Sequence, residues 1–263
     1  MGICPISLER YLDSGVKDNI DTPDIHGRSA LHWGAWVGNS SSLSRLLDVG
    51  ADPNLEDRGG RAPLHFSCMT TSAACTATLI KAGADPQKKD IFLQTPLHCA
   101  SANGRIANVE YLLSSGVDPS TQDNDGKTPL MAAVLSKQLD VVRILIAYDA
   151  KIEMRDNAGE TAATLAIWVN AGQIVQVLSR AGADFNILTD SGRTILHTAA
   201  RFCDIRTLEA LFKVNLSSFQ SSTLNAQGLT PLEVLKQRND LTPELLETFN
   251  ALLLQTDVGR LYH

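Results

Sequence analysis

The chain has 263 residues, of which 44% are hydrophobic, 20% are charged and only 5% are aromatic. Its 23 Lys and Arg against 29 Asp and Glu give a formal net charge of −6, which disfavours nucleic-acid binding because attraction to phosphates supplies most of that affinity. The sequence has no apolar run long enough to span a membrane, no signal-peptide core in MGICPISLERYL, and no paired spacing among its five cysteines. We therefore expect an intracellular protein, cytoplasmic, nuclear or both, with no membrane insertion and no nucleic-acid partner.

A four-residue motif recurs along the chain. Its first copy is Ser29-Ala30-Leu31-His32, and a more regular copy is Thr95-Pro96-Leu97-His98. The copies begin at residues 29, 62, 95, 128, 161, 194 and 230, so five consecutive gaps are 33 residues and the last is 36. Equal spacing of similar residues indicates an internal repeat, which determines the fold more strongly than any local pattern.

Other residues keep the same period. Asp stands five residues before most copies of the motif and Gly two residues before them, as at Asp57 and Gly60. A pair of large apolar residues follows most copies and Gly closes most units, as at Leu79-Ile80 and Gly83. With its 33-residue period and its Thr-Pro-Leu-His core, the sequence from about residue 7 to residue 254 resembles the ankyrin-repeat family.

Each unit reads as a turn followed by two helices. Asp-x-x-Gly-x-Thr is turn chemistry, and Thr-Pro then opens a helix with an N-cap and a proline at the first helical position. In the third unit these signals predict a first helix over 97–103 and a second over 107–114, ended by Gly116. A unit of this size cannot bury its own apolar face, so neighbouring units must stack.

The predicted fold class is therefore all-α: an ankyrin-repeat solenoid of helix-turn-helix units with β-hairpin loops, about six full repeats and a capping half-repeat at each end. Leu93 and Asp149 stand where other units have Gly, and Thr161-Ala162-Ala163-Thr164 replaces the motif in the fifth unit. The polar, Ser-rich segment 216–224 is three residues longer than elsewhere and predicts a looser loop. We expect an N-terminal capping half-repeat at 1–23, repeats at 24–56, 57–89, 90–122, 123–155, 156–188 and 189–224, and a C-terminal capping repeat at 225–263.

The sequence carries no signature of catalysis. Four histidines share one repeat position, and stacking would place consecutive ones roughly 8–10 Å apart, too far to share a zinc ion. The family resemblance implies instead that they are structural hydrogen-bonding residues at the helix starts. Motifs for nucleophilic, phosphate-loop, metalloprotease and dinucleotide chemistry are missing from the sequence. We expect no enzyme, no metal and no cofactor. The four histidines are His32, His65, His98 and His197.

The resemblance implies that the chain binds another protein in a concave groove formed by hairpin tips and first helices. The groove-facing helix position is apolar in several units, the residue before the motif is cationic in four, and one hairpin tip is apolar. Aromatic anchors flanked by cations are typical of interface hot spots. The candidate partner-binding residues are Trp36, Met69, Leu135, Trp168, Phe202, Arg28, Arg61, Lys127, Arg193, Ile91 and Phe92.

Other interpretations stay open. Trp36 and Trp168 also suit packing against the next repeat, and a basic hairpin residue also suits a solubilising surface. The favoured function is a non-catalytic, monomeric interaction module that binds an apolar and acidic segment of a partner, as in signalling adaptors and transcriptional co-regulators. The alternatives are the ankyrin scaffold region of a larger multidomain protein, and a substrate of asparaginyl hydroxylation, for which the resemblance implies Asn54 and Asn186.

Overall fold

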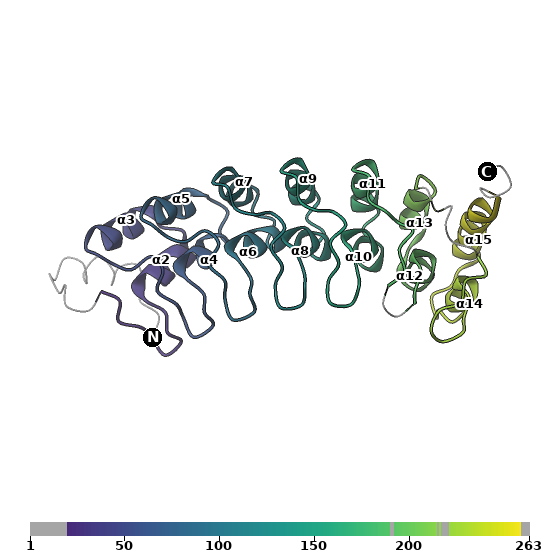
Figure 1. Ribbon diagram of the computed structural model, residues 1–263, viewed down its shortest axis with the longest axis horizontal. Coiled ribbons are helices and arrows are strands. Elements are labelled where there is room, and N and C mark those ends of the chain that lie inside the picture. Colours follow the sequence, from purple (N-terminus) through teal and green to yellow (C-terminus); the bar gives the residue numbers. More distant parts are fainter. Residues whose placement is uncertain (1–19, 190–191, 215, 217–220, 259–263) are drawn as a thin grey trace. The chain divides into compact units, whose positions relative to one another are not determined.

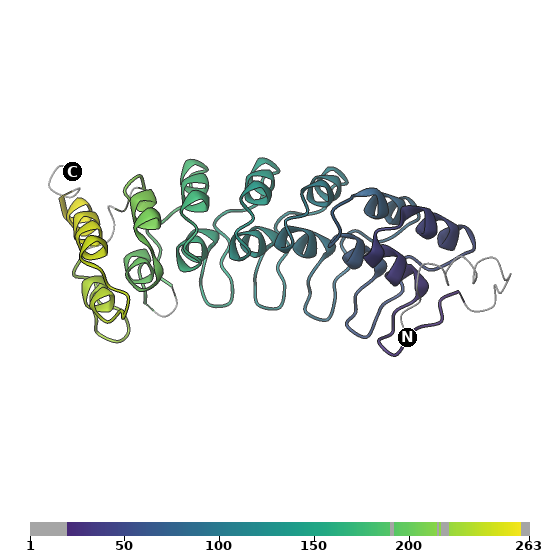
Figure 2. The ribbon, with the colours of Figure 1, turned by 180° about the vertical axis from the view of Figure 1, so that it is seen from behind.

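The computed structural model describes residues 20–189, 192–214, 216 and 221–258, drawn from opposite sides in Figures 1 and 2. The chain divides into two compact units, Met1–Asn124 and Asp125–His263, and each is described by itself. The described residues form fourteen helices and no β-strand, which confirms the all-α class. The loops that we expected to be β-hairpins turn back on themselves through short backbone hydrogen bonds, as between Asp57 N–H and the Arg61 carbonyl (2.9 Å), without forming strands in this part of the chain.

The N-terminal unit holds three helix pairs. Figure 1 shows the first helices α2, α4 and α6 in one row and the second helices α3, α5 and α7 in another. Each first helix packs on its own second helix, and within this unit α2 packs on α4 and α4 on α6, so neighbouring pairs depend on one another. The helices are α2 (Ala30–Val37), α3 (Ser40–Asp48), α4 (Pro63–Ser67), α5 (Ala74–Lys81), α6 (Pro96–Ala102) and α7 (Ile106–Ser114).

The C-terminal unit holds four pairs with the same arrangement. Contacts run from α8 to α10, from α10 to α12 and from α12 to α14 along the first helices, and α11 packs on α13 and α13 on α15 along the second. The last helix is twice the usual length. The helices are α8 (Pro129–Leu135), α9 (Leu139–Ala147), α10 (Ala162–Trp168), α11 (Gly172–Arg180), α12 (Ile195–Phe202), α13 (Ile205–Leu211), α14 (Pro231–Lys236) and α15 (Pro243–Val258).

The recurring motif supplies both the helix starts and the core. In α6, the extended residue Thr95 is the N-cap, Pro96 takes the first helical position, and the Thr95 N–H donates to Nδ1 of His98 at 3.1 Å. The motif leucines of the earlier copies, such as Leu97, are buried, whereas Leu232 of the last copy is half-buried. The predicted helix and its start are confirmed, because cap chemistry and burial of the motif leucine favour the same boundary.

The fifth unit keeps its helix although the motif is altered. Thr161 and Thr164 form a reciprocal cap: the Thr161 N–H donates to the Thr164 hydroxyl at 2.8 Å, and the Thr164 N–H faces the Thr161 hydroxyl at 3.5 Å. The threonine hydroxyl thus substitutes for the imidazole within the repeat. Residues 1–19 of the half-repeat expected at 1–23, and residues 217–220 of the loose loop expected at 216–224, lie outside the described residues.

Four described non-glycine residues adopt the left-handed conformation that glycine adopts elsewhere, and the sequence singled out two of them, Leu93 and Asp149. Leu93 has φ = 57°, at the turn position where Gly60 has φ = 72°, and Asp149 has φ = 59°, at the helix-end position where Gly116 has φ = 83°. The repeat therefore imposes the backbone conformation even where the side chain disfavours it. Leu93 is 41% exposed, so its side chain gains little from packing.

Leu93→Gly is expected to raise the free energy of unfolding by roughly 0.5–1 kcal/mol, because relief of the left-handed conformation exceeds the entropy that glycine adds to the unfolded chain. Urea unfolding followed by circular dichroism measures this change. The control is Gly60→Leu, one repeat earlier, which should destabilise because a Cβ there would lie 3.0 Å from the Ile91 nitrogen. A Leu93→Gly variant less stable than the wild type would contradict the prediction.

Candidate protein-binding surface

Two aromatic side chains meet on the first-helix row of the N-terminal unit. Trp36, at the end of α2, packs edge-on against Phe66 of α4, with 5.8 Å between ring centroids. Phe66 is buried, whereas Trp36 remains 53% exposed. Trp36 therefore contacts the next repeat, as the packing interpretation expected, and still presents half of its surface to solvent.

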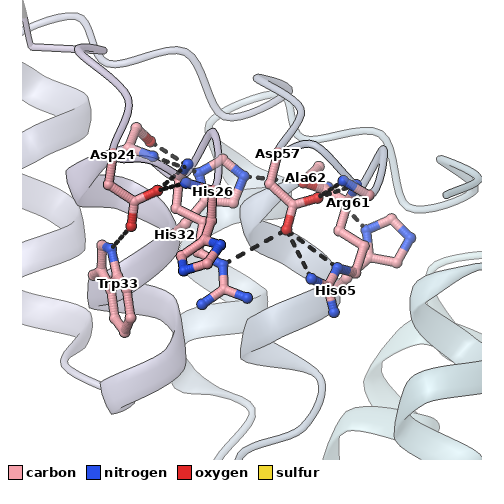
Figure 3. Close-up of polar contacts among 11 residues, drawn as sticks. Asp24, His26, His32, Trp33, Asp57, Arg61, Ala62 and His65 are labelled. Atoms are coloured by element: carbon pink, nitrogen blue, oxygen red, sulfur yellow. Dashed lines mark hydrogen bonds and ion pairs between the residues drawn. The ribbon is translucent and has the colours of Figure 1, made fainter. Parts of the chain in front are cut away.

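The cations Arg28 and Arg61 flank one buried carboxylate. Arg61 donates to Asp57 Oδ2 from Nη2 at 2.9 Å and from Nε at 3.2 Å, and Arg28 Nε lies 3.7 Å from the same oxygen (Figure 3). Asp57 Oδ1 accepts the N–H groups of Gly59 and Arg61. Burial alone would raise the pKa of Asp57, but these hydrogen bonds outweigh it and hold the pKa below its usual value. The carboxylate is therefore charged and organises the hairpin.

Both guanidinium groups also stack on aromatic rings. Arg61 lies 4.9 Å and Arg28 5.2 Å from the centre of the Phe66 ring, and Arg28 lies 5.3 Å from that of Trp33. The Trp33 indole N–H in turn donates to Asp24 at 3.1 Å (Figure 3). Cation–π contact and ion pairing together hold these two arginines against the helices.

The motif histidines join consecutive repeats. The N-cap N–H donates to Nδ1 of His32 and of His65, which places the imidazole proton on Nε2. From there His32 donates to the Arg61 carbonyl at 2.9 Å and His65 to the Gln94 carbonyl at 3.1 Å. Burial lowers the pKa of both histidines, so they are neutral near pH 7. The implied structural role is confirmed.

The hairpin tips of the N-terminal unit form a ladder. The Arg58 N–H donates to the His26 carbonyl at 2.9 Å and the Ile91 N–H to the Gly59 carbonyl at 3.0 Å. Ile91 and Phe92 are 57% and 58% exposed at the third tip. The ladder thus holds a rigid edge whose apolar side chains face solvent.

The C-terminal unit has an aromatic pair of its own. Trp168, at the end of α10, is 50% exposed and packs edge-on against Phe202 at the end of α12, with 6.2 Å between centroids. The Arg201 guanidinium lies 5.6 Å from the centre of the Phe202 ring. The arrangement resembles the pair of Trp36 and Phe66, although Phe202 lies beyond the repeat position that Phe66 occupies.

The other candidate residues are less accessible. Lys127 pairs with Asp125 at 2.7 Å and Arg193 with Glu160 at 3.5 Å, so all four candidate cations have a carboxylate neighbour within the chain. The side chains of Met69 and Leu135 are half-buried. The structure therefore exposes the aromatic and hairpin-tip candidates most fully and uses the cations in ion pairs.

The sequence interpretation missed Phe66, Trp33 and Arg201. Phe66 and Trp33 occupy the same repeat position, four residues after the start of the motif, where the third unit has Cys99. Two large aromatics in place of a small side chain were a signal in the sequence. Arg201 occupies the groove-facing position of its unit, but nothing in the sequence shows whether an arginine there is paired.

Asn54 lies between the loops of two repeats. Its side-chain amide donates to the Gly83 carbonyl at 2.9 Å and its Oδ1 accepts the Asp85 N–H at 2.8 Å. The Asn186 N–H donates to the Asp184 carboxylate at 2.8 Å. Hydroxylation at either asparagine stays a prediction.

The described residues contain no cluster of three His, Cys, Asp or Glu side chains that could hold a metal ion. Burial raises the pKa of Cys68 and of Cys99 to about 12, so both thiols are poor nucleophiles. Among the helices of the described residues, none is both long and apolar enough to span a bilayer.

Comparison with known proteins agrees with this architecture. The sequence model of the family described as ankyrin repeats (3 copies) matches residues 31–123 and 109–189, more than half of the chain in total. The chain therefore belongs to the ankyrin-repeat family, whose repeats are in general protein–protein interaction modules. Among solved structures, the human ASB11 ankyrin repeat domain is similar with a TM-score of 0.74 and 26% sequence identity, over 87% of this chain and 98% of that one. No curated protein sequence matches the chain.

Asp57→Asn is expected to lower the free energy of unfolding by about 2 kcal/mol, because it leaves Arg28 and Arg61 without their shared carboxylate in a buried setting. Chemical denaturation measures this loss. Asp125→Asn removes an exposed ion pair with Lys127 and serves as the control, with an expected loss below about 0.5 kcal/mol. Equal losses in the two variants would show that burial adds nothing to the Asp57 contacts.

The buried histidines predict a pH-dependent stability. Since the folded-state pKa of His65 lies below the unfolded value of about 6.5, the unfolded chain binds the proton first and stability falls as the pH drops below about 6.5. His65→Gln should make the slope of unfolding free energy shallower between about pH 7 and pH 5.5. His26→Gln, at an exposed hairpin tip, is the control for loss of one histidine. If the slope is unchanged in His65→Gln, the lowered pKa of His65 is not a source of the pH dependence.

Proposed function

We propose that the chain is a non-catalytic interaction module that binds a segment of another protein on its first helices and hairpin tips. The observation that carries this proposal is the exposure of Trp36 (53%) and Trp168 (50%), one in each unit, at the ends of first helices. Each packs on a phenylalanine of the next repeat, which holds the indole in place. A fixed, half-exposed tryptophan is a typical interface anchor, because it buries a large area on binding at little cost in side-chain entropy.

The chemistry of the surface favours a partner segment that is apolar and acidic. Ile91, Phe92 and the partly exposed Met69 add apolar contact area in the N-terminal unit, and the partly exposed Leu135 and Phe202 add it in the C-terminal unit. Positive charge comes from Arg28 and Arg61 in the first unit and from Lys127 and Arg193 in the second. Because these four cations already have carboxylate neighbours, we assign most of the affinity to the apolar side chains and assign to the cations the steering of an acidic partner.

A module of this kind suits a monomeric adaptor or a transcriptional co-regulator in the cytoplasm or nucleus, or the scaffold region of a larger polypeptide. In each of these roles the chain contributes binding and no bond-making chemistry. The buried, high-pKa thiols of Cys68 and Cys99 and the structural histidines support this assignment.

The test uses the double variant Trp36→Ala/Trp168→Ala. A partner captured by the wild-type chain and identified by cross-linking is titrated against each variant by biolayer interferometry. The double variant should bind at least about tenfold more weakly, because two anchors are removed.

Tyr148→Ala is the matched control, since it removes an exposed aromatic at the end of a second helix, α9. Its affinity should stay within about twofold of wild type. Circular dichroism must show that all variants keep their helices. Unchanged affinity in the folded double variant would contradict the proposed function.

A further inference from the structure

A cavity of about 340 Å³ lies within the C-terminal unit, between α12, α14 and the hairpin at 225–228. Its apolar wall includes Phe202 and Val234, and two of its lining residues, Arg193 and Arg201, are cationic. No Asp or Glu is among the described residues that line it. A second hollow of about 400 Å³, which the ion pair of Arg238 and Asp240 also lines, shares Arg201, Phe202 and Val234 with the first.

Beside the cavity, the turn glycine Gly192 lies farther from the following hairpin than the turn glycines of other repeats do. In three other repeats, a Cβ built on the turn glycine would lie 2.8 to 3.0 Å from the backbone nitrogen of the next hairpin. At Gly192 the corresponding distance, to the nitrogen of Ala226, is 3.8 Å. The base of the hairpin is still attached, since His197 Nε2 lies 3.0 Å from the Leu229 carbonyl oxygen. Gly192 therefore lies farther from the next hairpin, while α12 and α14 remain in contact.

Arg201 differs from the other arginines around this space. Arg193 faces Glu160 at 3.5 Å, and Arg238 donates to Asp240 at 2.8 Å and to the Cys203 carbonyl at 2.7 Å. The Arg201 side chain is exposed and has neither a hydrogen bond nor an ion pair with any described residue, and its guanidinium lies 5.6 Å from the centre of the Phe202 ring. Its five N–H donors are available on the rim of the first cavity, which no described Asp or Glu lines.

We propose that this cavity binds an Asp or Glu side chain of a partner segment, with an adjacent apolar side chain against Phe202 and Val234. A planar guanidinium pairs with a carboxylate through two parallel hydrogen bonds. A phosphate dianion would require more uncommitted cations than Arg201 supplies. This inference rests on the proposed function. It assigns the direct contact with the partner's carboxylate to Arg201 rather than to the four cations that already have carboxylate neighbours.

The probe for the test is 3-phenylpropionate, which carries one carboxylate and one apolar group. It is titrated into the full 28.4 kDa chain while backbone amide signals are followed by transverse-relaxation-optimised NMR. We expect saturable shifts confined to residues 198–202, 225–228 and 234–237. The neutral 3-phenylpropionamide should bind at least about fivefold more weakly, because it forms no charge-assisted pair.

Variants assign the contact to one residue. Arg201→Gln should abolish saturable binding of 3-phenylpropionate, whereas Arg180→Gln, which removes the same charge from an exposed position on α11, should retain it. Equal binding of acid and amide, or full binding by a folded Arg201→Gln variant, would overturn the proposal. Tighter binding of phenyl phosphate than of 3-phenylpropionate would overturn the assignment to a carboxylate.

This result is separable from the test of the proposed function. The small acid reports on the cavity whether or not the tryptophans bind a partner. Loss of partner binding in Trp36→Ala/Trp168→Ala together with no saturable 3-phenylpropionate binding would overturn the cavity assignment alone. Retained partner binding in that variant would overturn the proposed function instead.

Discussion

A hydrogen bond from Nε2 of a motif histidine to a main-chain carbonyl in the following repeat recurs along the chain. It joins His32 to Arg61 at 2.9 Å, His65 to Gln94 at 3.1 Å and His197 to Leu229 at 3.0 Å. Two short helices cannot bury their own apolar face, so each repeat is stable only against its neighbours. This bond sets the position of the next hairpin on the preceding first helix. It requires a neutral imidazole, which burial favours by lowering the histidine pKa.

The fifth repeat shows what this constraint tolerates. Thr164 replaces the histidine and caps its own helix, but the hydrogen bonds of its hydroxyl are made with Thr161, within the same repeat. Other groups join this repeat to its neighbours: the Asp204 N–H donates to Asn170 Oδ1 at 3.0 Å from the next repeat, and Arg155 of the preceding repeat donates to the Leu188 carbonyl at 3.2 Å. Inter-repeat cohesion is thus distributed, and the loss of one bond does not remove the helix pair.

The same stacking explains why the surface aromatics are rigid. Trp36 and Trp168 each rest on a phenylalanine of the following repeat, so structural packing and exposure coexist in one side chain. The stacking also determines which arginines have a carboxylate partner. Arg61 is held by Asp57 and stacks on Phe66, whereas Arg201 stacks on Phe202 without a carboxylate partner among the described residues. Arg61 has a structural role because it pairs with the buried carboxylate of Asp57, whereas Arg201 carries the same charge without such a partner among the described residues.

The repeat period by itself determined the all-α class, the helix starts and the buried motif leucines, because cap chemistry and apolar periodicity act within one repeat. It also located the left-handed positions of Leu93 and Asp149. Only the tertiary structure decided which candidate residues are exposed and which cations are paired. Arg28 meets Asp57 and Trp36 meets Phe66 about one repeat away, and the separation of Gly192 from Ala226 beside the cavity depends on how whole repeats stack. Such contacts join residues distant in sequence, so no local pattern encodes them.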